Sequence, residues 1–173
     1  VIDGIRRLNE AGYLIIIVTN QGGVAKGEYS IEDVDNLHAH MCKELEKHGA
    51  HVDKIYYCPH HSSIAPCKCR KPSPYMIEQA IREFDIDGLR LDVAYCLPPE
   101  YLRALRAFTD GLKPGFVLLG ETLHCDYNRS MNDEMCHSVT NYECYKGLYS
   151  SFNTMNLFEI GYSLNRQFGP EPW

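Results

Sequence analysis

The sequence Leu14-Ile15-Ile16-Ile17-Val18, with Thr19-Asn20-Gln21-Gly22-Gly23 directly after it, decides the fold class of this chain. A continuous apolar run of this length is typical of a strand that is covered on both faces, as the strands of parallel sheets are. Helical patterns flank the run, at residues 2–10 and 30–45. Because strands that alternate with helices indicate parallel pairing, the sequence predicts an α/β fold.

The pattern from Ser30 onward predicts a helix with a well-defined start. Asp33 stands three residues after Ser30, which is the spacing of a capping box. The apolar residues that follow recur at helical spacing and predict one buried stripe. The stripe consists of Ile31, Val34, Leu37, Met41 and Leu45.

Composition limits the classes of function. The chain has 173 residues, which is enough for a hydrophobic core, and its net charge is −6 without a basic block. Nucleic acid binding therefore has no electrostatic support. No apolar run approaches about 18 residues, so a membrane span is not expected. The chain shows neither an initiator Met nor a signal peptide at Val1, and we expect it to start inside a longer gene product.

Cysteines indicate a metal site rather than disulfides. Cys58, Cys67 and Cys69 lie close together beside His60, and the other five cysteines are scattered. Three thiolates and one imidazole make a closed tetrahedral set for Zn²⁺, which is the structural type of zinc site. His61 is the alternative fourth ligand, and free loop thiols are the alternative to a metal. A reduced, cytoplasmic setting fits this cysteine usage best.

Two polar segments near this loop suit a phosphate group. Arg70 and Lys71 follow the cysteines directly, and an Arg beside a Lys can bind phosphate as a fork and a point charge. Thr19 and Asn20 close the apolar strand, and ligands of α/β sheets bind beyond the carboxyl ends of strands. The alternatives are a solvated surface patch for the cations and an ordinary polar turn for Thr19 and Asn20.

Together these residues make the segment at 1–86 resemble the haloacid dehalogenase superfamily. The segment is most similar to the zinc-containing branch of heptose bisphosphate and histidinol-phosphate phosphatases, through the zinc loop and Cys69-Arg70-Lys71-Pro72. The resemblance implies a sugar-phosphate substrate and a Mg²⁺ cofactor. It also implies that Thr19 is the phosphate-binding hydroxyl, that Asn20 and Arg70 contact substrate, and that Lys71 steadies a phosphoaspartate.

The segment departs from this family at two places. The nucleophile and the acid/base of the family are aspartates on a first strand that should precede Val1. The acidic Mg²⁺-binding motif should follow Ile86, and Gly88-Leu-Arg-Leu-Asp92 does not match it. Because phosphoryl transfer to the protein needs the nucleophile, we expect the chain as given to have little or no turnover.

The second half carries a different set of charged residues. Arg90 and Asp92 are predicted to project from the same face of one strand, and Glu121 ends the next predicted strand. Both carboxylates would then lie on one rim of a parallel barrel. Glycosidases use such a pair, with one carboxylate as nucleophile and one carboxylic acid as proton donor. The alternative is that these residues are structural or surface charges.

Residues 84–173 resemble the alpha-amylase family of glycoside hydrolases through Gly88-Leu-Arg-Leu-Asp92 and Leu119-Gly-Glu121. The resemblance implies a retaining glycosidase acting on α-glucans. It implies that Asp92 is the nucleophile, Glu121 the acid/base and Arg90 the residue that orients Asp92. His124 is either a subsite neighbour or a plain loop histidine. The family's Asn-His motif is absent, and its later His-Asp motif would lie beyond Trp173.

The predicted architecture is therefore a partial haloacid-dehalogenase-like Rossmannoid parallel sheet at 1–86, joined to a partial TIM (β/α)8 barrel segment at 87–173. The join falls near Asp85–Gly88, where the sequence fits both the end of the phosphatase helix and the approach to the amylase strand. A recombined or misassembled gene is the preferred explanation, as a hypothesis. Near the end, residues 126–149 are interpreted as loop. Phe152, Met155, Phe158 and Tyr162 recur at helical spacing and are predicted to be core.

Three functions follow from these patterns. The first is a sugar-phosphate phosphatase fragment, with the second half as a passenger. The second is a fragment of a retaining glycosidase that acts on α-glucans. The third is an inactive zinc-stapled module that only binds phosphate. The oligomeric state stays open.

Overall fold

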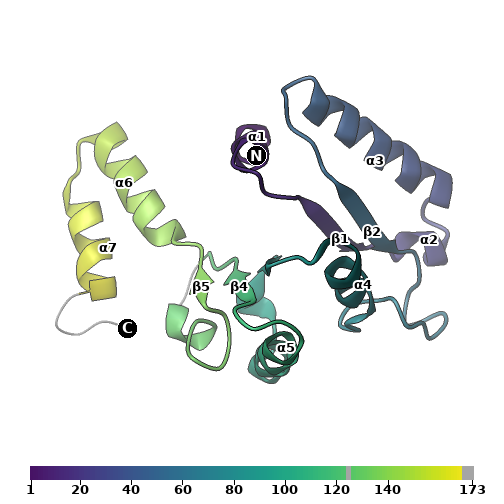
Figure 1. The fold of residues 1–173 in the computed structure, drawn as a ribbon. Coiled ribbons are helices and arrows are strands. Elements are labelled where there is room, and N and C mark those ends of the chain that lie inside the picture. The colour runs from purple at the N-terminus through teal and green to yellow at the C-terminus, as the bar shows by residue number, and fades with distance from the viewer. Residues whose placement is uncertain (124–125, 169–173) are drawn as a thin grey trace. The chain divides into compact units, whose positions relative to one another are not determined.

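The structure is a computed structural model that describes residues 1–123 and 126–168. It is a mixed arrangement of helices and parallel strands, which confirms the predicted α/β class (Figure 1). The chain divides into two compact units, at residues 1–86 and 87–173.

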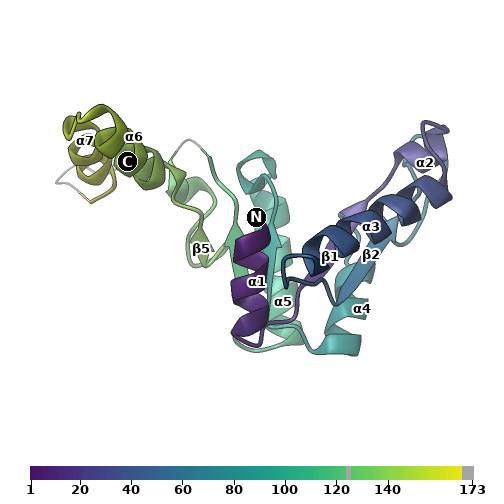
Figure 2. The ribbon, with the colours of Figure 1, turned by 90° about the horizontal axis from the view of Figure 1, so that it is seen from above.

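The N-terminal unit contains a pair of parallel strands, β1 and β2, between helices. Its elements are α1 (Ile2–Glu10), β1 (Ile16–Asn20), α2 (Gly23–Lys26), α3 (Ile31–Glu46), β2 (Lys54–Cys58) and α4 (Tyr75–Phe84). The strands pair in register from Ile16 opposite Lys54 to Asn20 opposite Cys58. Helices α3 and α4 lie on opposite sides of this pair (Figures 1 and 2). The apolar run predicted a strand covered on both faces, but β1 is only half-buried, and Leu14 lies before it and is exposed.

Helix α3 begins as the sequence predicted, but its buried stripe is narrower. The Ser30 hydroxyl accepts a hydrogen bond from the Asp33 amide at 3.0 Å, and the Asp33 carboxylate accepts one from the Ser30 amide at 2.8 Å. Val34 and Leu45 are buried, whereas Ile31 and Leu37 are exposed. The prediction is therefore wrong for Ile31 and Leu37. Only two strands lie under the helix, so part of its apolar face meets no neighbour.

The C-terminal unit is built on a second parallel sheet. Its elements are β3 (Gly88–Leu91), η1 (Ala94–Cys96), α5 (Pro99–Leu112), β4 (Val117–Gly120), η2 (Tyr127–Arg129), β5 (Ser138–Val139), α6 (Tyr142–Thr154) and α7 (Phe158–Phe168). Strand β4 lies between β3 and β5, and all pairings are parallel. Phe116, Leu118 and Leu102 are fully buried here. The described residues form a three-stranded sheet, and its assignment to a TIM barrel stays a prediction.

Two expectations for the last third of the chain are wrong. Residues 126–149, interpreted as loop, contain η2, β5 and the first part of α6. The predicted core stripe lies on the surface: Phe152, Met155, Phe158 and Tyr162 are all exposed. Met155 has a positive φ of 58° and separates α6 from α7, so these four side chains do not share one helix face.

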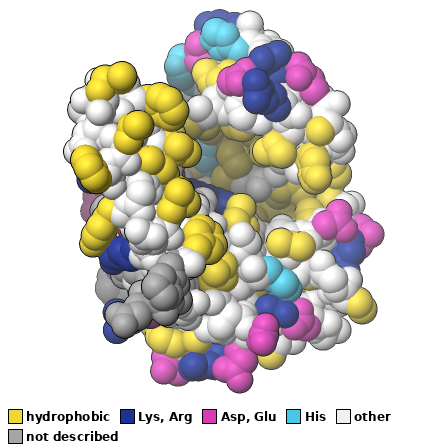
Figure 3. Space-filling view, turned by 90° about the vertical axis from the view of Figure 1, so that its left-hand side faces the viewer, with side chains coloured by type: hydrophobic (Ala, Val, Ile, Leu, Met, Phe, Trp, Pro, Cys, Tyr) yellow, Lys and Arg dark blue, Asp and Glu magenta, His cyan; other side chains and the backbone are white. Residues whose placement is uncertain are grey.

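Small residues, and not the predicted aromatic stripe, form the contact between α6 and α7. A Cβ atom at Gly147 would lie 2.8 Å from the Ser163 Oγ, and the buried Ser151 hydroxyl accepts a hydrogen bond from the Ile160 amide at 3.1 Å. The large apolar side chains are left on the outside, and Figure 3 shows them spread over the left-hand lobe. Among the helices of the described residues, none combines the length and apolar character needed to cross a membrane.

Candidate zinc centre and phosphate site

The carboxyl ends of β1 and β2 meet at one edge of the sheet. Asn20 and Cys58 are the last paired residues and stand opposite each other. The Gln21 amide then donates to the Cys58 carbonyl at 2.7 Å, and the Ala25 amide donates to the Pro59 carbonyl at 3.1 Å. The loops that leave the two strands are thereby tied together at this edge, where parallel sheets carry their ligand sites.

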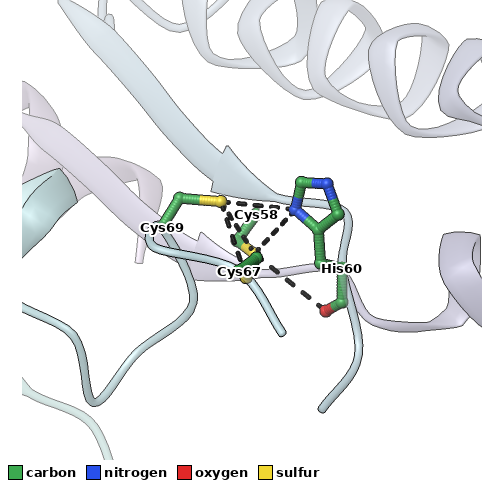
Figure 4. A group of neighbouring side chains, drawn as sticks. All are labelled: Cys58, His60, Cys67 and Cys69. Atoms are coloured by element: carbon green, nitrogen blue, oxygen red, sulfur yellow. Dashed lines mark hydrogen bonds between the residues drawn. The ribbon is translucent and has the colours of Figure 1, made fainter. Parts of the chain in front are cut away.

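The loop after β2 gathers four metal-ligand atoms (Figure 4). The Sγ atoms of Cys58, Cys67 and Cys69 lie 3.2 to 3.9 Å apart. The His60 Nδ1 lies 3.6 Å from the Cys58 Sγ and 3.3 Å from the Cys69 Sγ. Two sulfurs on a tetrahedral zinc ion, each bonded at about 2.3 Å, would lie roughly 3.8 Å apart. The cluster therefore fits zinc, and it contains His60 rather than His61.

Electrostatics at the cluster also favour a cation. Burial, together with the neighbouring thiols of Cys58 and Cys67, raises the pKa of the Cys69 thiol to about 12. Burial also acts to raise the pKa of Cys67, but hydrogen bonds, led by that from the Arg70 backbone, lower it overall. Three close sulfurs cannot all become thiolates without a positive charge among them, and Zn²⁺ would supply that charge. Four protein ligands would leave no open position, as in structural sites.

Lys71 is tied to β1 by three hydrogen bonds, two with Asn20 and one with Val18. The Asn20 Nδ2 donates to the Lys71 carbonyl at 3.2 Å, and the Lys71 amide donates to the Asn20 Oδ1 at 3.0 Å. The Lys71 Nζ donates to the Val18 carbonyl at 2.8 Å. Asn20 thus holds the main chain of Lys71 in place, and the ammonium group lies beside β1 at Val18.

Arg70 is fixed beside the zinc loop. Its Nη1 donates to the His60 carbonyl at 2.9 Å. A Cβ atom at Gly22 would lie 3.0 Å from the same Nη1, so the guanidinium group rests close to the turn after β1. Thr19 precedes Asn20 on β1 and, by strand alternation, points to the other face. The structure brings Asn20, Arg70 and Lys71 together and leaves Thr19 outside their hydrogen bonds.

The second unit brings together the charged residues predicted there. Arg90 forms ion pairs with Asp92 and, through Nη2 at 2.7 Å, with the Glu121 Oε1. The Glu121 side chain is 15% exposed and also accepts hydrogen bonds from the Tyr142 hydroxyl and the Val93 amide, both at 3.2 Å. Asp92 is exposed. Arg90 lies on β3, and Asp92 and Glu121 follow the paired ends of β3 and β4. His124 lies outside the described residues.

Three neighbours of these sites were not predicted. Tyr142 contacts Glu121 from the start of α6, in a segment interpreted as loop. Gly22 lies close to Arg70, and this proximity depends on a contact between distant parts of the chain. His61 was weighed only as an alternative zinc ligand. The only sequence signal for His61 was that it directly follows His60, a residue of the cluster.

Comparison with known families decides the assignment of the N-terminal unit. The family model described as polynucleotide kinase 3 phosphatase matches residues 1–96, which is more than half of the chain. The chain belongs to this family. The match includes the zinc cluster, Asn20, Arg70 and Lys71, and it extends past residue 86.

Curated proteins that are similar to this chain include heptose bisphosphate phosphatases. A D-glycero-beta-D-manno-heptose-1,7-bisphosphate 7-phosphatase of Pasteurella multocida is 42% identical over 91 residues, or 50% of each chain. One from Neisseria meningitidis is 32% identical over 120 residues, covering 69% of this chain and 62% of its own. The chain spans about half the length of the first curated relatives it matches. These matches support the resemblance to haloacid dehalogenase phosphatases.

Solved structures give the same fold. The crystal structure of D,D-heptose 1,7-bisphosphate phosphatase from B. bronchiseptica, complexed with magnesium and phosphate, has a TM-score of 0.59 at 23% identity. The match covers 87% of this chain and 82% of that one. The structure of AmyP in complex with maltose matches at a TM-score of 0.48 and 16% identity, which is too weak to show a shared fold. The glycosidase and chimera assignments are therefore not confirmed.

Proposed function

We propose that the N-terminal unit binds the phosphate ester of a sugar phosphate, as part of a phosphatase of the D-glycero-D-manno-heptose-1,7-bisphosphate 7-phosphatase type. The observation that carries this proposal is the position of Arg70 and Lys71. Both cations follow the zinc cluster directly and are held at the carboxyl edge of β1 by bonds to His60, Asn20 and Val18. The names of the curated relatives support the same substrate class.

The chemistry of the two cations suits a phosphate monoester. Arg70 has donors beyond the Nη1 that bonds to His60, and a guanidinium can hold two phosphate oxygens at once. Lys71 adds a compact positive charge at the strand end, where it would also steady a phosphoaspartate. Asn20 completes the set that the hydrogen bonds hold together, and the phosphate-binding role of the Thr19 hydroxyl rests on the family resemblance. Mg²⁺ belongs to the proposed reaction as the ion that would neutralise the phosphate charge.

Zinc has a supporting part in this proposal. The loop ligands Cys58, His60, Cys67 and Cys69 would hold the ion with no open position, so it would clamp the loop rather than touch substrate. Because Arg70 is adjacent to Cys69 in sequence and bonded to His60 in space, the clamp would set the direction of the guanidinium group.

Substitution of Arg70 is the direct test of this function. We expect Arg70→Ala to weaken the binding of inorganic phosphate to the zinc-loaded chain by roughly 10- to 100-fold, because a charged hydrogen-bond donor is lost. Isothermal titration calorimetry measures the change. Arg82→Ala, an exposed position on α4, is the matched control and should leave the affinity unchanged. Equal phosphate affinities of the Arg70 and Arg82 variants would refute the assignment.

A second candidate function is favoured by the charged cluster of the C-terminal unit. One guanidinium, that of Arg90, contacts both Asp92 and Glu121 beyond the ends of neighbouring parallel strands. We propose that this unit is a retaining glycosidase segment with α-glucan as substrate. Asp92 would be the nucleophile, Glu121 the acid/base, and Arg90 the residue that orients Asp92.

Hydrolysis of an aryl α-maltoside tests the second candidate. If it is correct, Glu121→Gln lowers the steady rate of aryl release by roughly 100-fold or more, because the general acid and base is lost. Glu100→Gln, an exposed carboxylate on α5, should leave the rate unchanged. Turnover that does not depend on Glu121 would exclude this role.

The third candidate is a zinc-stapled module that binds phosphate without turnover. It rests on the closed character of the four-ligand cluster. Phosphate affinity that depends on Arg70, together with no hydrolysis of sugar phosphates or maltosides, would favour this candidate over both enzymes.

A further inference from the structure

The ring of His61 has a fixed orientation that is separate from the zinc cluster. The Ser63 amide donates a hydrogen bond to the His61 Nδ1 at 3.2 Å, and the Ser63 hydroxyl oxygen lies 2.7 Å from the same atom. A backbone N–H can only donate, so Nδ1 is an acceptor and carries no proton. In the neutral ring the proton is then on Nε2, which becomes a donor.

The Cδ2 edge of this ring, next to Nε2, lies at the turn after β1. A Cβ atom at Gly22 would lie 2.9 Å from the His61 Cδ2, which is the carbon bonded to Nε2. The same Cβ would lie 3.0 Å from the Arg70 Nη1. The absence of a side chain at Gly22 therefore leaves room for the imidazole and the guanidinium beside the same residue of this turn. His61 is half-buried, so its orientation is supported by the loop around it.

A directed N–H beside a guanidinium is a suitable pair for an anionic oxygen. Arg70 supplies charge and several N–H groups, of which Nη1 bonds to the His60 carbonyl. Because the Nδ1 of His61 accepts from the Ser63 amide, its N–H is directed from Nε2. Such a pair can replace water at a phosphate oxygen with two hydrogen bonds, one of them from a charged donor.

We propose that His61 is a further phosphate-binding residue, which donates from Nε2 to an oxygen of the phosphate monoester that Arg70 holds. This inference rests on the proposed phosphatase site and adds a residue to it. It assigns two separate tasks to adjacent histidines: His60 supplies a ligand atom to the zinc cluster, and His61 faces the turn at Gly22.

Two substitutions distinguish a donor from a ring that only fills space. His61→Phe keeps a ring and removes the donor, whereas His61→Gln retains an amide N–H at about the position of Nε2. We expect His61→Phe to weaken binding of inorganic phosphate to the zinc-loaded chain by about fivefold, the effect of one neutral hydrogen bond. His61→Gln should stay within about twofold of the parent chain. Calorimetry gives the affinities, and elemental analysis should give an unchanged zinc content.

A measurement on the unsubstituted chain guards against misfolding of the variants. Proton–nitrogen correlation spectra of the histidine rings should show the His61 Nε2 signal moving when phosphate is added, with Nδ1 remaining unprotonated. An unmoved His61 signal, or full phosphate affinity in a folded His61→Phe chain, overturns the inference. If the His61 inference fails but Arg70→Ala still loses phosphate affinity, the proposed function stands. Loss of zinc in His61→Phe would also overturn the His61 inference. Absence of phosphate binding by the parent chain would overturn both proposals.

Discussion

Loss of zinc is expected to unfold the loop between β2 and α4 and to destabilise the N-terminal unit by about 4 kcal/mol or more, the range reached when a protein loses a structural metal. Cys69→Ser is the substitution of choice, because its Sγ contacts the Sγ of Cys58 and the Nδ1 of His60. The loop has few other anchors. Residues 62–66 are exposed, and in the described structure no large apolar side chain of the loop is buried.

The loop connects the zinc cluster to the phosphate residues, so a second effect is expected in the same variant. Arg70 follows Cys69 directly and bonds to the carbonyl of the ligand His60. Without the ion, that carbonyl is no longer held, and phosphate affinity should fall at least as far as in Arg70→Ala. Hydrogen exchange over residues 59–72 should accelerate, since the backbone there would open more often.

Urea unfolding followed by circular dichroism measures the change in stability, and elemental analysis measures bound zinc. Cys42→Ser is the matched control, because Cys42 lies on α3 outside the cluster and is also half-buried. The control should retain zinc and unfold within about 1 kcal/mol of the parent chain. A Cys69→Ser chain that keeps one equivalent of zinc, or that unfolds at the parent's urea concentration, would contradict the structural role.

Features that depend on residues close together in sequence were predictable. The capping box of Ser30 and Asp33 needs only a spacing of three, and the apolar run before Thr19 needs only its own composition. The zinc ligands lie within 12 positions of one another, from Cys58 to Cys69, and their chemistry identifies them. Local chemistry was therefore enough for the fold class and for the cluster.

Features that depend on distant contacts were not predictable. The proximity of Gly22 to Arg70 and His61 arises only when β1 and β2 pair, because the residues are far apart in sequence. The contact between Tyr142 and Glu121 likewise needs the start of α6 to return to the end of β4. Periodicity misled the interpretation of Phe152 and Phe158, since it cannot show that Met155 turns the chain between them.

The C-terminal unit offers the other large expected effect, at Phe116. This side chain is fully buried just before β4, so Phe116→Ala should lower the free energy of unfolding of this unit by about 3–5 kcal/mol, from lost burial and the cavity left behind. Phe152 is 72% exposed on α6, and Phe152→Ala should change it by less than about 0.5 kcal/mol. The core predicted from sequence would require a large loss at Phe152 as well, so this pair separates that interpretation from the structure.

The same pair tests whether residues 1–86 and 87–173 are separate domains, which remains our proposal. If they fold independently, Phe116→Ala should leave the zinc content, the phosphate affinity and the hydrogen exchange of α3 and α4 unchanged. Hydrogen exchange resolved by peptide measures both units in one sample. Faster exchange in α3 and α4 would mean that the two units share one cooperative transition. Such coupling would argue against two unrelated enzyme segments, because surfaces that did not evolve together should contribute little to each other's stability.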